Sequence, residues 1–202
     1  MNWWHRAHAT PLTAAVVIAT MLLTPLLGGS TLPIPSLLAG MSAGIPVPLV
    51  LPAIPAALTL HALNRVPRVY DTTAVRPVAR YQAGMLTAAA FLATTMGLGA
   101  AYAADSSLSL AAARNFLGYL GTGLIVQYLA GHMYGPLTVA LVPVVCALIG
   151  LGPGGRPFFW TWPLHEATSP IAATAALLLL AAGIATTTLL TPRRDASRSA
   201  AA

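Results

Sequence analysis

The chain has 202 residues, of which 57% are hydrophobic and only 7% carry a formal charge. A soluble domain carries roughly 25% charged residues, so this composition excludes an ordinary soluble fold and makes lipid the solvent for much of the surface. The net charge of +6 comes from ten arginines and four acids separated by apolar stretches, which excludes a nucleic-acid partner that needs clustered basic residues.

Stretches without charged residues indicate where the chain can cross a bilayer. A charge near the bilayer centre costs a few kcal/mol, and a span needs about 20 residues. By length, the charge-free stretches 7–64, 81–104, 115–155 and 167–192 hold two, one, two and one spans. Turn-forming segments at 28–44 and 131–136 divide the two long stretches. The sequence therefore predicts an all-α, polytopic membrane protein with six transmembrane helices, near residues 12–27, 45–63, 81–104, 115–130, 137–151 and 171–190.

The positions of the arginines predict the orientation. Arginines concentrate in the cytoplasmic loops of membrane proteins. An N-terminus inside the cell places Arg114 and Arg156 outside and the other eight inside: Arg6, Arg65, Arg68, Arg76, Arg80, Arg193, Arg194 and Arg198. We therefore expect both termini in the cytoplasm of a bacterium, residues 1–191 as a single six-helix domain in the plasma membrane, and residues 192–202 as a disordered tail. A secretory signal peptide is the alternative for the first span.

The inner loop Asn64–Arg80 is the first candidate functional feature. It combines four arginines with one acid, and its middle fits a short interfacial helix with one apolar stripe. Contact with anionic lipid and docking of a cytoplasmic partner are both open interpretations. The docking residues are then Arg65, Arg68, Val69, Tyr70, Asp71, Arg76 and Arg80.

Prolines, small residues and amides inside the spans form the second candidate feature. Pro52 and Pro55 predict a kink that leaves backbone carbonyls unpaired in the second span. Small residues recur on one face of the third span, and Gly123, Gln127 and Gly131 recur on one face of the fourth. Helix packing and a substrate path both fit these patterns. The candidates for either role are Pro52, Pro55, Thr87, Thr94, Gly123 and Gln127.

Other polar residues of the spans and loops have two interpretations each. Asn115, Tyr119 and Thr122 share another face of the fourth span and fit hydrogen bonds between helices. Glu166 fits an exposed loop acid better than a proton-coupling group, and the aromatic run 158–162 fits an interfacial or re-entrant anchor.

Catalytic signatures are absent from the sequence. It contains no phosphate-binding Gly-rich loop with lysine, no serine nucleophile elbow, no His-Glu-x-x-His and no paired intramembrane carboxylates. We therefore expect a protein that is not an enzyme and holds no cofactor. The one cofactor alternative is a haem between His61 and His132, at the inner ends of two spans.

The predicted topology, together with local sequences that enter three of the spans, resembles the exporter-type permease subunits of ABC transporters, in particular small actinobacterial proteins of this kind. These sequences are 76–80 (Arg-Pro-Val-Ala-Arg), 114–118 (Arg-Asn-Phe-Leu-Gly) and 160–163 (Trp-Thr-Trp-Pro). The resemblance implies a homodimer, or a heterodimer with a second permease, and a separate cytoplasmic ATPase that engages residues 65–80. An amphipathic or lipophilic substrate then moves at the subunit interface, with ATP used by the partner. The short segment before the first span and the loop before the sixth depart from the family pattern.

Two other functions fit the sequence. The chain can be a non-transporting membrane scaffold or immunity-type subunit that holds or shields another protein. It can also be a haem-binding redox subunit.

Overall fold

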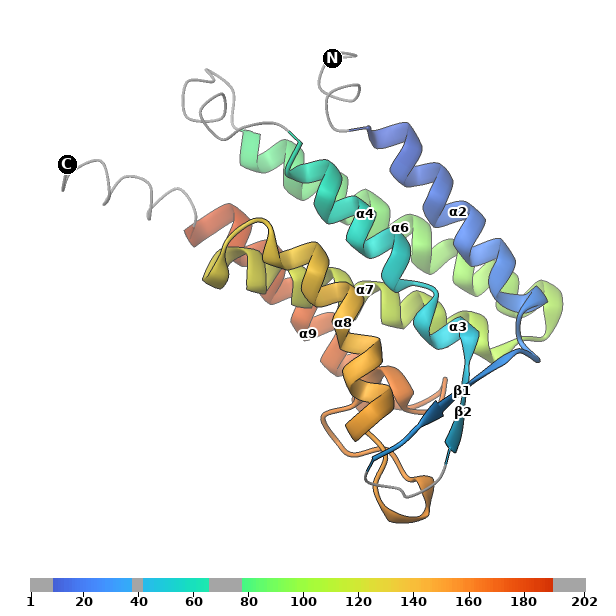
Figure 1. The fold of residues 1–202 in the computed structure, drawn as a ribbon. Helices are drawn as coiled ribbons and strands as arrows, with labels where there is room; N and C mark the ends of the chain where they lie inside the picture. The colour runs from blue at the N-terminus through green and yellow to red at the C-terminus, as the bar shows by residue number, and fades with distance from the viewer. Residues whose placement is uncertain (1–8, 38–41, 66–77, 191–202) are drawn as a thin grey trace.

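A computed structural model describes residues 9–37, 42–65 and 78–190 (Figure 1). The described chain is mostly helical, which confirms the all-α prediction at that level. Its helices are α2 (Thr10–Leu26), α3 (Val47–Val50), α4 (Ala53–Leu63), α6 (Val78–Ala104), α7 (Ser107–Ala130), α8 (Tyr134–Ile149) and α9 (Pro170–Ala185), which continues into the π-helical turn η3 (Thr186–Leu190). The shorter elements are the strands β1 (Thr31–Pro35) and β2 (Ser42–Pro46) and the 3-10 turns η1 (Pro153–Gly155) and η2 (Trp162–Leu164).

Local sequence signals account for several of the helix boundaries. Pro11 lies in the first turn of α2, where its missing N–H costs nothing. Ser169 caps α9, since its side chain accepts a hydrogen bond from the backbone N–H of Ala172. Gly131 ends α7 with a φ of 116°, which favours glycine.

Helix α7 lies at the centre of the bundle. It packs against α2, α3, α4, α6, α8 and α9, and it is buried along most of its length. At the crossing with α9, a methyl group on Gly121 would overlap the backbone of Leu179, and one on Gly183 would lie 2.8 Å from the Gly121 carbonyl oxygen. The two helices can therefore approach this closely only because both positions are glycine.

Two helices among the described residues are long and apolar enough to cross a membrane by length and composition: α6 and the helix Pro170–Thr188. The helices Thr10–Leu26, Val47–Leu63 and Tyr134–Ile149 are apolar but shorter. The structure therefore has a helix at each of the six predicted positions, but only two of them qualify as candidate spans.

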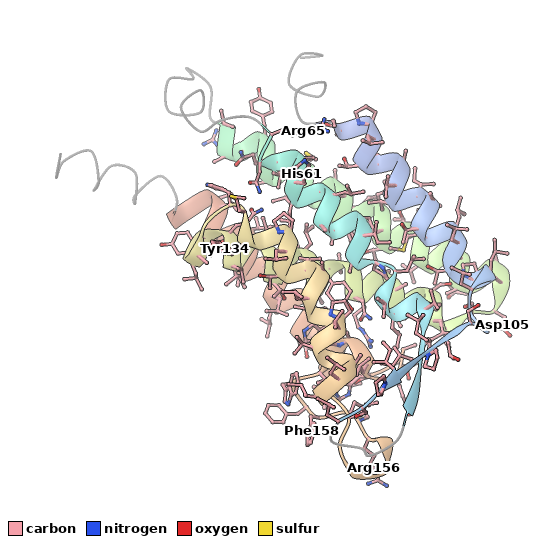
Figure 2. All side chains as sticks on the ribbon, in the orientation of Figure 1. His61, Arg65, Asp105, Tyr134, Arg156 and Phe158 are labelled. Carbon is pink, nitrogen blue, oxygen red and sulfur yellow. The ribbon has the colours of Figure 1, made fainter. Side chains whose placement is uncertain are left out.

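The described bundle has two ends, which Figure 2 shows by its labelled residues. His61, Arg65 and Tyr134 lie at one end, which we call the Arg65 end. Asp105, Phe158 and Arg156 lie at the opposite end, which we call the Arg156 end. The helices therefore run alternately between these ends in chain order.

Two predicted loops differ from the structure. The segment around residues 28–44 contains an antiparallel hairpin that pairs Thr31 with Pro46 and Pro35 with Ser42. This hairpin was not predicted, because prolines seldom occur inside strands. Residues 107–114 belong to α7, whereas the charge of Arg114 had predicted a loop outside the membrane. The predicted tail, residues 192–202, lies outside the described residues.

Candidate functional site

A buried polar cluster lies in the half of α7 nearest the Arg156 end, formed by Arg114, Asn115 and Tyr119. Asn115 and Tyr119 are fully buried, and Arg114 is 7% exposed. Because a buried polar group without a partner is costly, the hydrogen bonds of these side chains define what the cluster does.

Arg114 binds the loop that precedes α9. Its Nη1 donates to the carbonyl oxygen of Glu166 at 2.7 Å and its Nη2 to that of His165 at 3.0 Å. Its Nε donates to the side-chain oxygen of Asn115 at 3.3 Å. The guanidinium therefore fastens two consecutive loop carbonyls to α7 with the two-pronged geometry that arginine provides.

Asn115 binds two segments at once. Its Nδ2 donates to the carbonyl oxygen of Leu49 and to that of Pro163, each at 3.0 Å. The Tyr119 hydroxyl donates to the same Leu49 carbonyl at 3.0 Å. Leu49 lies in α3 and Pro163 in the loop before α9, so Asn115 connects two parts of the chain that are far apart in sequence.

The Leu49 carbonyl, which accepts side-chain hydrogen bonds, lies beside the break between α3 and α4. Pro52 and Pro55 have no amide N–H, and α3 ends at Val50 while α4 begins at Ala53. Across this break the backbone N–H of Leu51 donates to Val47 and that of Ile54 donates to Leu51. The side chains of α7 thus satisfy a carbonyl exposed by the interrupted helix.

Aromatic contacts complete the attachment of the loop. The Trp162 ring packs against the Tyr119 ring with centroids 5.2 Å apart, and a methyl group on Gly118 would overlap the Trp162 indole. Trp162 is buried against the bundle, whereas Phe159 and Trp160 are exposed. The loop's own fold adds a Thr161 hydroxyl that donates to the Phe158 carbonyl at 2.7 Å.

The electrostatics of the cluster are unusual for a buried cation. The hydrogen-bond acceptors of Arg114 are all uncharged oxygens within the described part of the chain. The Glu166 side chain is exposed, and its backbone carbonyl is the group that accepts from Arg114. Because every donated bond ends on a carbonyl oxygen, the cluster holds segments of the protein in position.

No family model, curated protein or solved structure matches this chain. The candidate functional features are therefore identified from the geometry of this chain alone.

The predicted docking loop is described only at its borders. Arg65 and Arg80 are both exposed, next to the end of α4 and in the first turn of α6 respectively. The remaining predicted docking residues, Arg68, Val69, Tyr70, Asp71 and Arg76, lie outside the described residues.

The predicted pathway residues do not come together at one place. Pro52 and Pro55 are buried at the α3–α4 break, whereas Thr87 is exposed on α6. The hydroxyls of Thr87 and Thr94 each donate at 2.8 Å to the carbonyl four residues earlier in α6. A methyl group on Gly123 would overlap the side chains of Leu60 and Val139, so Gly123 lies in a tight contact between α7, α4 and α8.

Gln127 is the exception among the pathway candidates. It is buried, its amide nitrogen Nε2 has no hydrogen-bond partner among the described residues, and its side chain covers Gly135 of α8. A separate contact is made by the side-chain amide of Asn64, which donates to the His132 carbonyl at 3.0 Å. This contact joins α4 to the turn between α7 and α8.

The two histidines of the haem alternative lie toward the same end of the bundle. His61 is exposed on α4, and His132 is half-buried in the turn after α7. No group of three or more His, Cys, Asp or Glu side chains among residues 9–37, 42–65 and 78–190 is arranged to hold a metal ion.

Sequence reasoning missed the partners of the cluster. It placed Asn115 and Tyr119 on one helix face and expected carbonyls to be freed by Pro52 and Pro55, but it did not connect the two. The spacing of Asn115 and Tyr119, four residues apart on a helix, was the signal that could have done so.

Proposed function

We propose that this chain is a multi-pass membrane protein with six spans and both termini in the cytoplasm. The exposed charged residues that Figure 2 labels support this, because Arg65 lies at one end and Asp105 and Arg156 lie at the other. Between the ends, the outward sides of the helices expose large apolar side chains, including Leu22, Phe91, Leu141, Leu177 and Leu178.

The lengths of the shorter helices also fit this proposal. The helices Thr10–Leu26, Val47–Leu63 and Tyr134–Ile149 measure about 25 Å at 1.5 Å per residue, a little less than a hydrocarbon core of about 30 Å. Thinning of the bilayer or flanking aromatic residues accommodate such a mismatch at modest cost. Helix α7 contains a charge, but its contacts with neighbouring helices and loop carbonyls shield Arg114 from lipid.

We infer that the protein is the permease subunit of an ABC-type exporter. The observation that carries this proposal is the filled centre of the bundle: α7 occupies it, and glycine contacts bring its neighbours against its backbone. A substrate then has to move along the outside of the unit, between subunits, where an amphipathic or lipophilic molecule is also soluble. Energy comes from a separate ATPase that binds the arginine-rich segment between α4 and α6.

The second candidate is a non-transporting scaffold or immunity-type subunit. The observation that favours it is the use of the buried polar groups, since Arg114, Asn115 and Tyr119 all bind the protein's own backbone. A subunit that only holds or shields another membrane protein needs a rigid unit of this kind.

Partner capture distinguishes the two candidates. The tagged protein is purified from its host in mild detergent, and the chains that come with it are identified by mass spectrometry. The exporter proposal predicts a cytoplasmic ATPase that is lost from an Arg68→Glu/Arg76→Glu variant. Arg156→Glu is the matched control, because it reverses an exposed arginine at the opposite end of the bundle.

One result would overturn the exporter proposal, and a second would overturn the assignment of its docking segment. One is an intact membrane complex that contains no ATPase, which supports the scaffold instead. The other is an ATPase that is lost equally from the Arg156→Glu control, which places the contact outside the arginine-rich segment.

A further inference from the structure

The loop formed by residues 151–169 is attached to the bundle differently from the helices. The helices meet through small residues, as where Gly97 of α6 faces Ala113 of α7. The loop instead meets α7 through hydrogen bonds from Arg114 and Asn115 to three of its carbonyls, with Trp162 as its buried aromatic anchor. Water can replace the hydrogen bonds to these carbonyls when the loop opens, whereas the burial of Trp162 opposes opening, so the closed loop is the favoured state.

The break between α3 and α4 is held by the same helix. Asn115 and Tyr119 both donate to the Leu49 carbonyl, which lies where the helix is interrupted. A broken helix can change its bend at the break with little loss of backbone hydrogen bonding. The position of α3 relative to α7 therefore depends on these two side chains.

Among the three cluster side chains, Asn115 is the one whose hydrogen bonds reach both segments. The backbone carbonyls that Arg114 binds belong to the loop, while Tyr119 hydrogen-bonds Leu49 and touches the loop through the Trp162 ring. A single amide group, Asn115 Nδ2, donates to Leu49 and to Pro163. Movement of one segment away from α7 thus removes a partner from the group that holds the other.

We propose that the 151–169 loop is a lid that opens and closes together with the α3–α4 break, and that Asn115 couples the two movements. Asn115 is a positioning residue in this device, because it acts by holding two backbone segments in register. The use of the lid as the outer gate of an exporter rests on the proposed function. The coupling itself does not, and it is tested on the purified protein without a substrate.

Hydrogen exchange at two pairs of backbone amides reports the two movements separately. Leu51 and Ile54 donate hydrogen bonds across the break, and Leu164 and Ser169 donate within the loop. The full-length protein in detergent is exchanged into deuterated buffer, and peptides that cover each pair are followed by mass spectrometry.

Three single variants and one double variant test the coupling. Tyr119→Phe removes a donor to Leu49 only, and because the two movements are coupled we expect exchange to rise about tenfold at Leu51 and Ile54 and to rise also at Leu164 and Ser169. Arg114→Met removes the donors to the loop, and the rise is again expected at both pairs. Asn115→Leu is expected to raise exchange at both pairs and to remove the coupling, so that Tyr119→Phe added to it raises exchange further at Leu51 and Ile54 only. Thr122→Val is the control, because its hydroxyl donates to Gly118 of its own helix, and it is expected to change neither.

The coupling is overturned if Tyr119→Phe and Arg114→Met each affect only the pair on their own side, or if Tyr119→Phe still affects both pairs in the Asn115→Leu background. Asn115→Asp covers the case in which the leucine variant does not fold. Its carboxylate still accepts from Arg114 Nε but cannot donate to Leu49 or Pro163, so the same two-sided rise is expected. If hydrogen exchange supports the coupling but no ATPase co-purifies with the protein, the coupled lid stands and only its role in export is overturned.

Discussion

The contact between α7 and α9 gives the sharpest prediction for stability. In Gly121→Ala the new methyl group overlaps the Leu179 backbone, which cannot move as a flexible side chain can. Overpacking of this kind costs about 3 kcal/mol, and the better helix propensity of alanine offsets about 1 kcal/mol of that. The expected net loss is about 2 kcal/mol in the free energy of unfolding, or an apparent Tm about 4–8 °C lower for a chain of this size.

Two glycines of α6 are the matched controls for this prediction. A methyl group on Gly84 or Gly99 would have no atom within 4 Å, so alanine there adds helix propensity without a clash. Each control is expected to raise the apparent Tm by about 2–4 °C. Intrinsic tryptophan fluorescence during a heating scan, at one fixed rate and in one detergent, measures all three variants. A Gly121→Ala protein as stable as the Gly99→Ala protein would refute the close contact between α7 and α9.

Three further predictions concern the loop, the buried amide and the orientation. Trp162→Ala is expected to lower the free energy of unfolding by about 3–5 kcal/mol, because it leaves a cavity against Tyr119 and Gly118. Denaturant titration measures this loss, and a value below about 1 kcal/mol would contradict the buried position of Trp162. Gln127→Met is expected to raise the apparent Tm by about 2–4 °C, because it removes a buried nitrogen that has no partner among the described residues; a lower Tm would indicate a polar role for Gln127. The orientation is tested in a Cys146→Ser background with an impermeant maleimide added to intact cells. The reagent is expected to label Thr168→Cys, at an exposed position of the 151–169 loop, and not Arg65→Cys. The reverse pattern would invert the proposed orientation.

The sequence predicted the positions of the helices well, because those positions follow from local properties. Charge-free stretches, divided by segments rich in glycine and proline, predicted six helix positions. The structure has a helix at each of them. Helix α7 begins at Ser107, whereas the fourth span was predicted to start near Asn115 because a charged residue next to an apolar run predicts a loop there. The guanidinium of Arg114 is instead satisfied by the carbonyls of Glu166 and His165, and those partners are 52 and 51 residues away in sequence.

The candidate site was predictable only in part, because its hydrogen bonds join residues that are far apart in sequence. The prolines indicated that carbonyls would be freed in the second helix, and Asn115 and Tyr119 were expected to bond between helices. Both bind the Leu49 carbonyl because α7 packs against α3. The local sequence does not indicate which helices pack together. The burial of Trp162 was missed because an aromatic run beside a span is equally typical of a membrane interface.

The central helix connects these observations. Because Gly118, Gly121 and Gly123 bring Trp162, α9 and Leu60 against α7, little of this helix remains for lipid or substrate to contact. The cost of placing Arg114 in such a helix is offset only if carbonyls from elsewhere reach it, which requires the 151–169 loop to be closed. The same cation that disrupts the charge-free pattern of the sequence therefore makes the loop a part of the bundle. Any change that opens the loop exposes this charge to water, and this links the state of the loop to the packing of the whole Arg156 end.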